Sequence, residues 1–157
     1  MIEPETDVIE NCEFCKIVAS AAPAEILYES DSCLAFFPLN PATKGHTLVI
    51  PKIHVRDFTC ATPETFGELS STAVEISRKL LTVYSPDGIN LITSAGRAAS
   101  QTIMHLHLHL VPRWNNDEVG DIWPPRRHTD RRILFDWAEE FRRFEGGIDN
   151  DHANQSS

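Results

Sequence analysis

The sequence lacks the features of membrane and secreted proteins. None of its apolar runs approaches the ~20 residues that a helix needs to cross a bilayer. The first residues, MIEPETDVIEN, are acidic and have neither the basic start nor the apolar stretch of a secretory signal. We therefore expect a cytoplasmic protein.

Basic residues are also scarce. The chain has 14 Lys and Arg residues against 23 Asp and Glu residues, which gives a formal net charge of -9. Broad binding to nucleic acid requires a basic face, so this balance argues against a nucleic-acid partner. A small anionic ligand is still possible, because backbone N–H groups and histidines can hold an anion inside an acidic protein.

The sequence contains no internal repeat, and its length of 157 residues fits one domain with a core of its own. Both ends are polar. We expect a flexible N-terminus over residues 1–11, a single domain over residues 12–145 and a disordered tail over residues 146–157.

Cysteines are few, and a reducing compartment disfavours disulfides between them. Cys12 and Cys15 form a Cys-x-x-Cys motif, which indicates either a metal site or a redox pair. A redox motif of this kind usually accompanies a thioredoxin-like βαβ pattern. The surrounding sequence lacks that pattern, so a metal site is the favoured interpretation.

The hydrophobic pattern predicts an α+β fold with an antiparallel sheet. Two apolar runs within residues 26–39, separated by a turn-like segment, indicate a pair of antiparallel strands. Further strands are expected at residues 46–51, 89–94 and 103–112.

Helices are expected at three places. Residues 12–21 form a short one, and Thr62 followed by Pro63 begins a long one that ends near Tyr84. A final helix is expected near residues 131–144. One of its faces would be apolar, formed by Leu134, Trp137, Ala138 and Phe141.

The segment QTIMHLHLHLVPR, residues 101–113, is the most informative. His105, His107 and His109 alternate in it with leucines, so a strand would place the leucines in the core and the histidines against a site. The histidines could be polar positions without a role, or they could bind a metal. They could also be catalytic, with one neutral imidazole attacking an electrophile and another assisting the departing group.

The chain resembles the histidine triad (HIT) superfamily of nucleotidyl hydrolases and transferases. The segments CEFCKIV, LAFFPLNPATKGHTLVIPKIHVRDF and QTIMHLHLHLVPRW occur in the order of that family and span about residues 12–114. The resemblance implies a HIT-like antiparallel sheet of about five strands, two main helices and a C-terminal helical extension. It also implies a homodimer.

The resemblance implies that His107 attacks the α-phosphorus of a dinucleoside polyphosphate or nucleoside phosphoramidate. Water would hydrolyse the resulting nucleotidyl-histidine to a nucleoside monophosphate. His109 would assist the leaving group, the His105 carbonyl would orient the His107 ring, and Thr102 would lie near the phosphate. Arg113 is interpreted as a structural or solvated charge. Transfer of the nucleotidyl group to another acceptor is an alternative, and so is nucleotide binding without turnover.

A nucleotide-binding pocket is also implied. The expected contacts are Phe14, Ile17, Phe36, Leu39, Asn40, His46, Ser94 and Gln101, although the apolar ones and His46 could equally be ordinary core residues. Two positions depart from the family. Pro38 replaces an acidic residue that many members use to bind the ribose hydroxyls, and Ser94 replaces a side-chain amide. The substrate preference therefore does not transfer.

The resemblance finally implies a tetrahedral Zn²⁺ site built from Cys12, Cys15, His54 and His105. Four protein ligands leave no open position, so this site would be structural. With His105 bound to the metal, His107 and His109 would remain free for chemistry.

Overall fold

The computed structural model describes residues 11–144. These residues fall into two compact units, which divide between Gly120 and Asp121. The single domain expected over residues 12–145 stays a prediction. Apart from Asn11, the expected flexible ends lie outside the described residues. Within the described part, no helix is long and apolar enough to cross a membrane.

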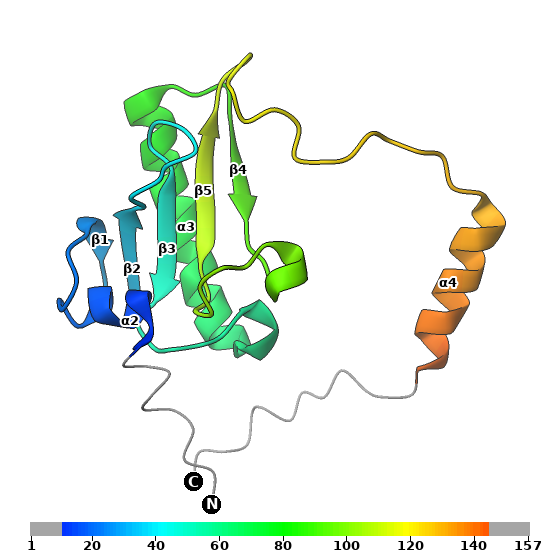
Figure 1. Cartoon of the computed structure of the whole chain (residues 1–157), viewed down its shortest axis with the longest axis horizontal. Helices are drawn as coiled ribbons and strands as arrows, with labels where there is room; N and C mark the ends of the chain where they lie inside the picture. Colours follow the sequence, from blue (N-terminus) through cyan, green and yellow to red (C-terminus); the bar gives the residue numbers. More distant parts are fainter. Residues whose placement is uncertain (1–10, 145–157) are drawn as a thin grey trace, which may run out of the picture. The chain divides into compact units, whose positions relative to one another are not determined.

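The first unit is built on a five-stranded antiparallel sheet (Figure 1). Its spatial order is β1-β2-β3-β5-β4, and every neighbouring pair is antiparallel. The predicted α+β class with about five antiparallel strands is therefore confirmed. The strands are β1 (Glu25–Glu29), β2 (Cys33–Phe37), β3 (Thr47–Pro51), β4 (Gly88–Ile92) and β5 (Leu108–Arg113).

Among the residues that the structure describes, this unit has the helices α2 and α3. The short α2 (Glu13–Val18) begins after Cys12, whose sulfur accepts a hydrogen bond from the Cys15 amide. The long α3 (Pro63–Tyr84) begins as predicted, because the Thr62 hydroxyl accepts the Thr65 amide and Pro63 occupies the first turn. Two 3₁₀ turns, η1 (Phe58–Cys60) and η2 (Arg97–Ala99), lie in the connecting segments.

The two faces of the sheet carry separate apolar clusters, because alternate side chains of a strand point in opposite directions. The helix α3 lies against one face of the sheet (Figure 1). On that face, Ala35 and Val49 pack against α3 residues such as Leu69 and Ile76. Residues of the opposite face pack around Phe14 of α2, namely Leu34, Phe36, Leu48 and Ile50. Burial of each large side chain contributes about 1.5–3 kcal/mol.

β5 is shorter than the sequence predicts. Leu106, Leu108 and Leu110 are all buried in the α3-facing cluster as expected. The strand begins only at Leu108, however, so His105 and His107 precede it. The physical reason is that the Leu106 amide donates to the Val55 carbonyl at 2.6 Å, which takes this residue away from ladder pairing.

The second unit contains α4 (Arg131–Arg143), which matches the predicted final helix. The Asp130 carboxylate caps it by accepting a 2.7 Å hydrogen bond from the Arg132 amide. Leu134, Trp137 and Phe141, on the expected apolar face, are exposed.

Candidate active site and metal cluster

His107 is held in one tautomer. Its Nδ1 lies 2.7 Å from the carbonyl oxygen of His105. A carbonyl only accepts, so Nδ1 carries the proton and donates, and the lone pair of the neutral ring is on Nε2. The hydroxyl of Thr93 donates to the His107 carbonyl at 2.9 Å and fixes the backbone here. Burial lowers the pKa of His107 and so favours this neutral form.

His109 contacts a fourth histidine. Its Nδ1 lies 2.9 Å from Nε2 of His46, and Nδ1 of His46 accepts the Ala42 amide at 3.0 Å. His109 is on β5 opposite Leu48 of β3, and the edge of its ring faces the His107 ring at 4.8 Å between centroids. Burial, reinforced by His107 and His46, lowers the pKa of His109 to about 4. His109 is therefore neutral at physiological pH.

A pocket of about 320 Å³ lies beside these two histidines. Its volume is at the lower end of the range for small-molecule sites. The expected site residues that line it are Phe14, Ile17, Phe36, Leu39, Asn40, Thr102, His107 and His109. The sequence interpretation missed the lining residues Glu13, Pro23, Ala24, Phe37, Leu48 and Ile103.

Most of the residues that line the pocket are apolar, and they range from buried to fully exposed. Phe14 and Phe36 are buried, whereas Leu39 is 94% exposed. The Pro38 ring also lines the wall and offers no side-chain hydrogen-bonding group. Among the described residues, neither Lys nor Arg lines this pocket, and Glu13 supplies its one carboxylate.

Three expected ligand contacts are not pocket-lining residues. His46 lies behind His109, and Ser94 is absent from the lining. Gln101 is buried, and its side chain is occupied within the fold. Its amide nitrogen donates to the carbonyls of Arg56 and Ile103 at 2.7 and 3.0 Å, and its oxygen accepts the Gly96 amide at 2.8 Å. Gln101 thus holds the segment that leads to His105.

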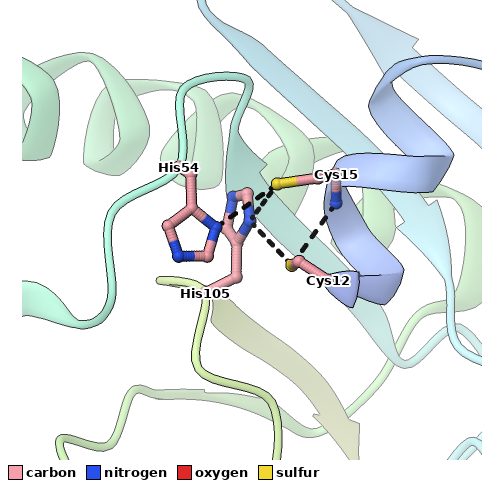
Figure 2. A group of neighbouring side chains, drawn as sticks. All are labelled: Cys12, Cys15, His54 and His105. Carbon is pink, nitrogen blue, oxygen red and sulfur yellow. Dashed lines mark hydrogen bonds between the residues drawn. The ribbon is translucent and has the colours of Figure 1, made fainter. Parts of the chain in front are cut away.

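Cys12, Cys15, His54 and His105 form one cluster (Figure 2). The cysteines come from the start of α2, His54 follows β3, and His105 precedes β5. The sulfur of Cys15 lies 3.3 Å from Nδ1 of His54 and 3.5 Å from Nδ1 of His105, and the sulfur of Cys12 lies 3.5 Å from the same His105 atom. Zinc bonds of ~2.3 Å to sulfur and ~2.0 Å to nitrogen at tetrahedral angles require S···N separations of about 3.5 Å. The four ligand atoms therefore fit a tetrahedral zinc site.

The protonation of His105 agrees with that fit. Nε2 of His105 lies 2.9 Å from the Pro51 carbonyl, so it donates and leaves Nδ1 free to bind a cation. Burial lowers the pKa of His105 to about 4, which keeps the ring neutral. Burial, together with Cys12, raises the pKa of Cys15 to about 11. A cation is what would stabilise the thiolates in such a site.

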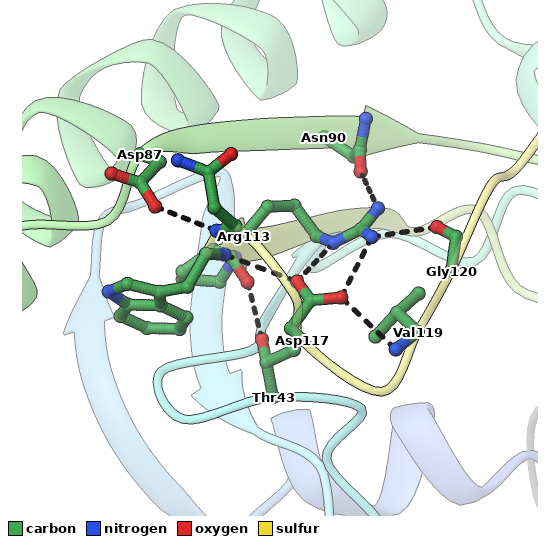
Figure 3. A network of polar contacts seen from close by, with 10 residues as sticks. Thr43, Asp87, Asn90, Arg113, Asp117, Val119 and Gly120 are labelled. Atoms are coloured by element: carbon green, nitrogen blue, oxygen red, sulfur yellow. Dashed lines mark hydrogen bonds and ion pairs between the residues drawn. The ribbon is translucent and has the colours of Figure 1, made fainter.

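A polar network follows the other end of β5 (Figure 3). The Arg113 guanidinium donates to both oxygens of Asp117 at 2.6 and 2.9 Å, to the Asn90 side chain at 2.8 Å and to the Gly120 carbonyl at 2.7 Å. Asp117 also accepts the amides of Trp114 and Val119. Arg113, the last residue of β5, is therefore held in a structural network and does not line the pocket.

The chain is similar to several known proteins. The family model described as HIT domain matches residues 19–116. Adenylylsulfatase HINT3 of Arabidopsis thaliana is 35% identical over 126 residues, which cover 80% of this chain and 64% of that protein.

Two solved structures show the same fold. SMU.412c from Streptococcus mutans UA159 matches with a TM-score of 0.80 and 41% identity, covering 84% of this chain and 83% of that one. A zinc-bound histidine triad family protein from Mycobacterium smegmatis matches with a TM-score of 0.67 and 37% identity. The match covers 85% of this chain and 97% of that one. The family model matches more than half of the residues, and His107 and His109 of the triad line a pocket, so this chain belongs to the HIT family.

Proposed function

We propose that this protein is a nucleotidyl hydrolase that acts at the α-phosphate of dinucleoside polyphosphates or nucleoside phosphoramidates. The carrying observation is the 2.7 Å hydrogen bond from Nδ1 of His107 to the His105 carbonyl. It puts the lone pair of a pocket-lining imidazole on Nε2, where it can attack phosphorus. The relative named as an adenylylsulfatase supports a nucleotidyl substrate.

The reaction proceeds in two displacements. In the first, the lone pair on Nε2 of His107 forms a bond to the α-phosphorus, and the bond to the leaving group breaks with its electron pair. In the second, a water oxygen attacks the same phosphorus, the phosphorus–nitrogen bond breaks, and the electron pair returns to Nε2. The water loses a proton to solvent, and a nucleoside monophosphate is released. His109 lies beside His107 and hydrogen-bonds the phosphate or the leaving atom.

The pocket should accept nucleotides without distinguishing strongly between their bases. Phe14, Ile17 and Phe36 offer an apolar slot in which any base can stack. Thr102 and Asn40 supply side-chain hydrogen-bonding groups, while Pro38 supplies none for the ribose. We expect turnover to depend little on which base is present.

We infer that Cys12, Cys15, His54 and His105 hold a structural Zn²⁺, since their spacing fits one and a zinc-bound relative shares the fold. The ion would supply rigidity, tying α2 to the segment before His107.

We also propose that the protein is a homodimer and is located in the cytoplasm. The described cysteines are all unpaired, which suits a reducing compartment. Light scattering on the purified protein tests the dimer.

The test compares the wild type with His107→Ala. Each is incubated with a dinucleoside tetraphosphate, a nucleoside phosphoramidate and a nucleotide sugar, and monophosphate release is followed by chromatography. We expect the variant to lose turnover by at least ~10³-fold, because the nucleophile is gone. Circular dichroism and zinc content verify that it is folded. Equal turnover by the two proteins would refute the mechanism.

Two other outcomes identify the alternatives. A nucleoside diphosphate formed when phosphate is added would show a transferase that uses the same intermediate. Tight monophosphate binding without turnover of any substrate would show a nucleotide-binding protein.

A further inference from the structure

Cys12 and Cys15 are placed to bond to each other as well as to a metal. The sulfur of Cys12 accepts the Cys15 amide at 3.5 Å, so it lies over the first turn of α2, beside the residue that carries the second sulfur (Figure 2). Both sulfurs also lie 3.5 Å from the same atom, Nδ1 of His105. In a helix, Cα atoms three residues apart are separated by about 5 Å. This separation is within the range of about 4.4–6.8 Å over which a disulfide can form without backbone movement.

The other two cysteines of the described residues have different surroundings. Cys33 is 1% exposed and belongs to the apolar cluster that includes α3. Cys60 is exposed and lies outside the cysteine–histidine cluster. Cys15, in contrast, is half-buried, and so is His54, whose Nδ1 lies 3.3 Å from the Cys15 sulfur. A small oxidant can therefore approach the cluster at Cys15, with the buried Cys12 sulfur next to it.

The same cluster supports one wall of the candidate active site. Phe14 lies between the two cysteines in α2, and its ring lines the pocket. The centre of this ring lies 5.8 Å from that of His105 and 5.4 Å from that of His107, both in T-shaped contacts. With six residues, α2 is far too short to be stable by itself, so it depends on the contacts that its residues make. A link that holds Cys12 and Cys15 therefore also holds Phe14 against His107.

Building on the proposed zinc site, we propose that Cys12 and Cys15 are a reversible oxidation site, at which a peroxide releases the metal and loosens the pocket wall formed by α2. The Cys15 thiolate attacks one oxygen of the peroxide, the O–O bond breaks, and a sulfenic acid and a hydroxide form. The Cys12 thiolate then attacks the Cys15 sulfur, the disulfide forms, and a second hydroxide leaves. The two sulfurs lose two electrons, the peroxide gains them, and both hydroxides take protons from solvent to become water.

This oxidation removes two of the four ligands. A disulfide sulfur carries no negative charge, and cysteine binds a metal as the thiolate. His54 and His105 alone are two imidazoles, fewer than the four ligands of a structural zinc site. A dithiol reductant reverses the step by exchange, since its own thiols become a disulfide and both cysteines return to thiols that can bind zinc again. In a reducing compartment the disulfide would thus be transient.

The first test follows the metal and is independent of turnover. The zinc-loaded full-length protein is treated with hydrogen peroxide, and released zinc is measured with a chromogenic chelator. We expect zinc to be released as a disulfide forms, and peptide mass mapping should assign that disulfide to Cys12 and Cys15. Dithiothreitol with added zinc should restore the bound metal. Zinc that stays bound in peroxide, or zinc released without this disulfide, would overturn the inference.

Two variants assign the release to this pair of cysteines. Cys60→Ser removes the exposed thiol and should release zinc at the wild-type rate. Cys15→His keeps a fourth ligand but cannot form the disulfide, so it should release zinc at least ~10-fold more slowly. Equal rates in Cys15→His and the wild type would contradict the proposal. If Cys15→His binds no zinc, the disulfide formed in Cys60→Ser decides the matter: a bond between Cys12 and Cys15 supports the proposal, and any bond to Cys33 overturns it.

Hydrogen exchange tests the link to the pocket wall. After peroxide treatment, the amides of α2 should exchange at least ~10-fold faster, whereas those of α3 should be unchanged. Protection of α2 that persists after zinc has left would refute the loosening. A protein that binds no zinc before treatment would refute the zinc site and this inference together, and its turnover would still test the hydrolase. Zinc release as expected, without turnover of any nucleotide, would refute the hydrolase alone.

Discussion

The two ends of β5 are fixed by different chemistry. Before the strand, two cysteines and two histidines from three distant segments converge on one point (Figure 2). At the other end, Arg113, the last residue of the strand, binds Asp117 four residues later and the Gly120 carbonyl, and Asn90 of β4 is a further partner (Figure 3). Joining distant segments costs more loop entropy than closing a local turn. The start of β5 therefore needs a stronger link than hydrogen bonds provide, and a metal ion is suited to that.

The two ends also differ in their distance from the chemistry. His105 of the metal cluster lies two residues before His107, and its carbonyl orients the His107 ring. Arg113 lies four residues after His109, and its partners Asp117, Asn90 and Gly120 are not among the residues that line the pocket. Substitutions in the cysteine–histidine cluster before β5 should therefore lower both turnover and the free energy of unfolding. Substitutions at Arg113 should mainly lower the free energy of unfolding.

The largest effect is expected from Cys15→Ser at the start of β5. Loss of one thiolate should remove the metal, lower the free energy of unfolding by on the order of 5 kcal/mol and abolish most turnover. Metal analysis by mass spectrometry and thermal unfolding measure these effects. Cys60→Ser is the matched control, because Cys60 is exposed and outside the cluster. If Cys15→Ser keeps one zinc per chain and wild-type stability, the two ends do not differ as we argue.

Gly45→Ala should have the next largest effect. Gly45 has a φ of 81°, and an added Cβ would lie 2.7 Å from two ring carbons of Tyr84. The strain and the clash should cost about 1–3 kcal/mol and, by displacing the adjacent His46, should lower turnover as well. Denaturant unfolding and steady-state kinetics measure the two. Gly67→Ala is the control, since nothing lies within 4 Å of its added Cβ. It should be neutral or stabilising, because alanine favours a helix.

Arg113→Lys tests the end of β5 alone. Lysine keeps the charge but cannot reach both oxygens of Asp117, the Asn90 side chain and the Gly120 carbonyl at once. We expect the melting temperature to fall by a few degrees while kcat/KM stays within about threefold of the wild type. Arg142→Lys, on an exposed pair with Glu139, should change neither. A collapse of kcat/KM in Arg113→Lys would show that both ends control the chemistry.

The sequence predicted features that depend on local pattern. The alternation of His105, His107 and His109 with leucines predicted that the leucines are buried, and Thr62 with Pro63 marked the start of α3. Of the three histidines, His107 and His109 line the pocket, and His105 lies in the cysteine–histidine cluster. The four residues of the cysteine–histidine cluster were reached through family resemblance, because no spacing rule connects Cys12 and Cys15 to His54.

The features that could not be predicted are contacts between distant segments. The bond from Leu106 to Val55, which delays the start of β5, and the contact between His46 and His109 join residues far apart in the chain. Gln101 was expected to contact ligand, but three backbone groups occupy its side chain. Such hydrogen bonds depend on the tertiary arrangement of the connecting segments, and hydrophobic periodicity does not predict that arrangement.

The smallest effect is expected from acid at the end of β5. The hydrogen bonds from Arg113 hold the pKa of Asp117 well below its usual range, with help from the amides of Trp114 and Val119. A lowered folded-state pKa stabilises the protein above the unfolded pKa of ~3.9, and this contribution is lost as the pH falls toward the folded value. Asp117→Asn should therefore be less stable than the wild type at pH 7, and the gap should narrow below about pH 4. Urea unfolding of both proteins across this range, with metal content checked at each pH, measures the gap. A gap that widens in acid would mean that Asp117 is not held as a carboxylate by Arg113, and the end of β5 would then depend on the neutral contacts of Asn90 and Gly120 instead.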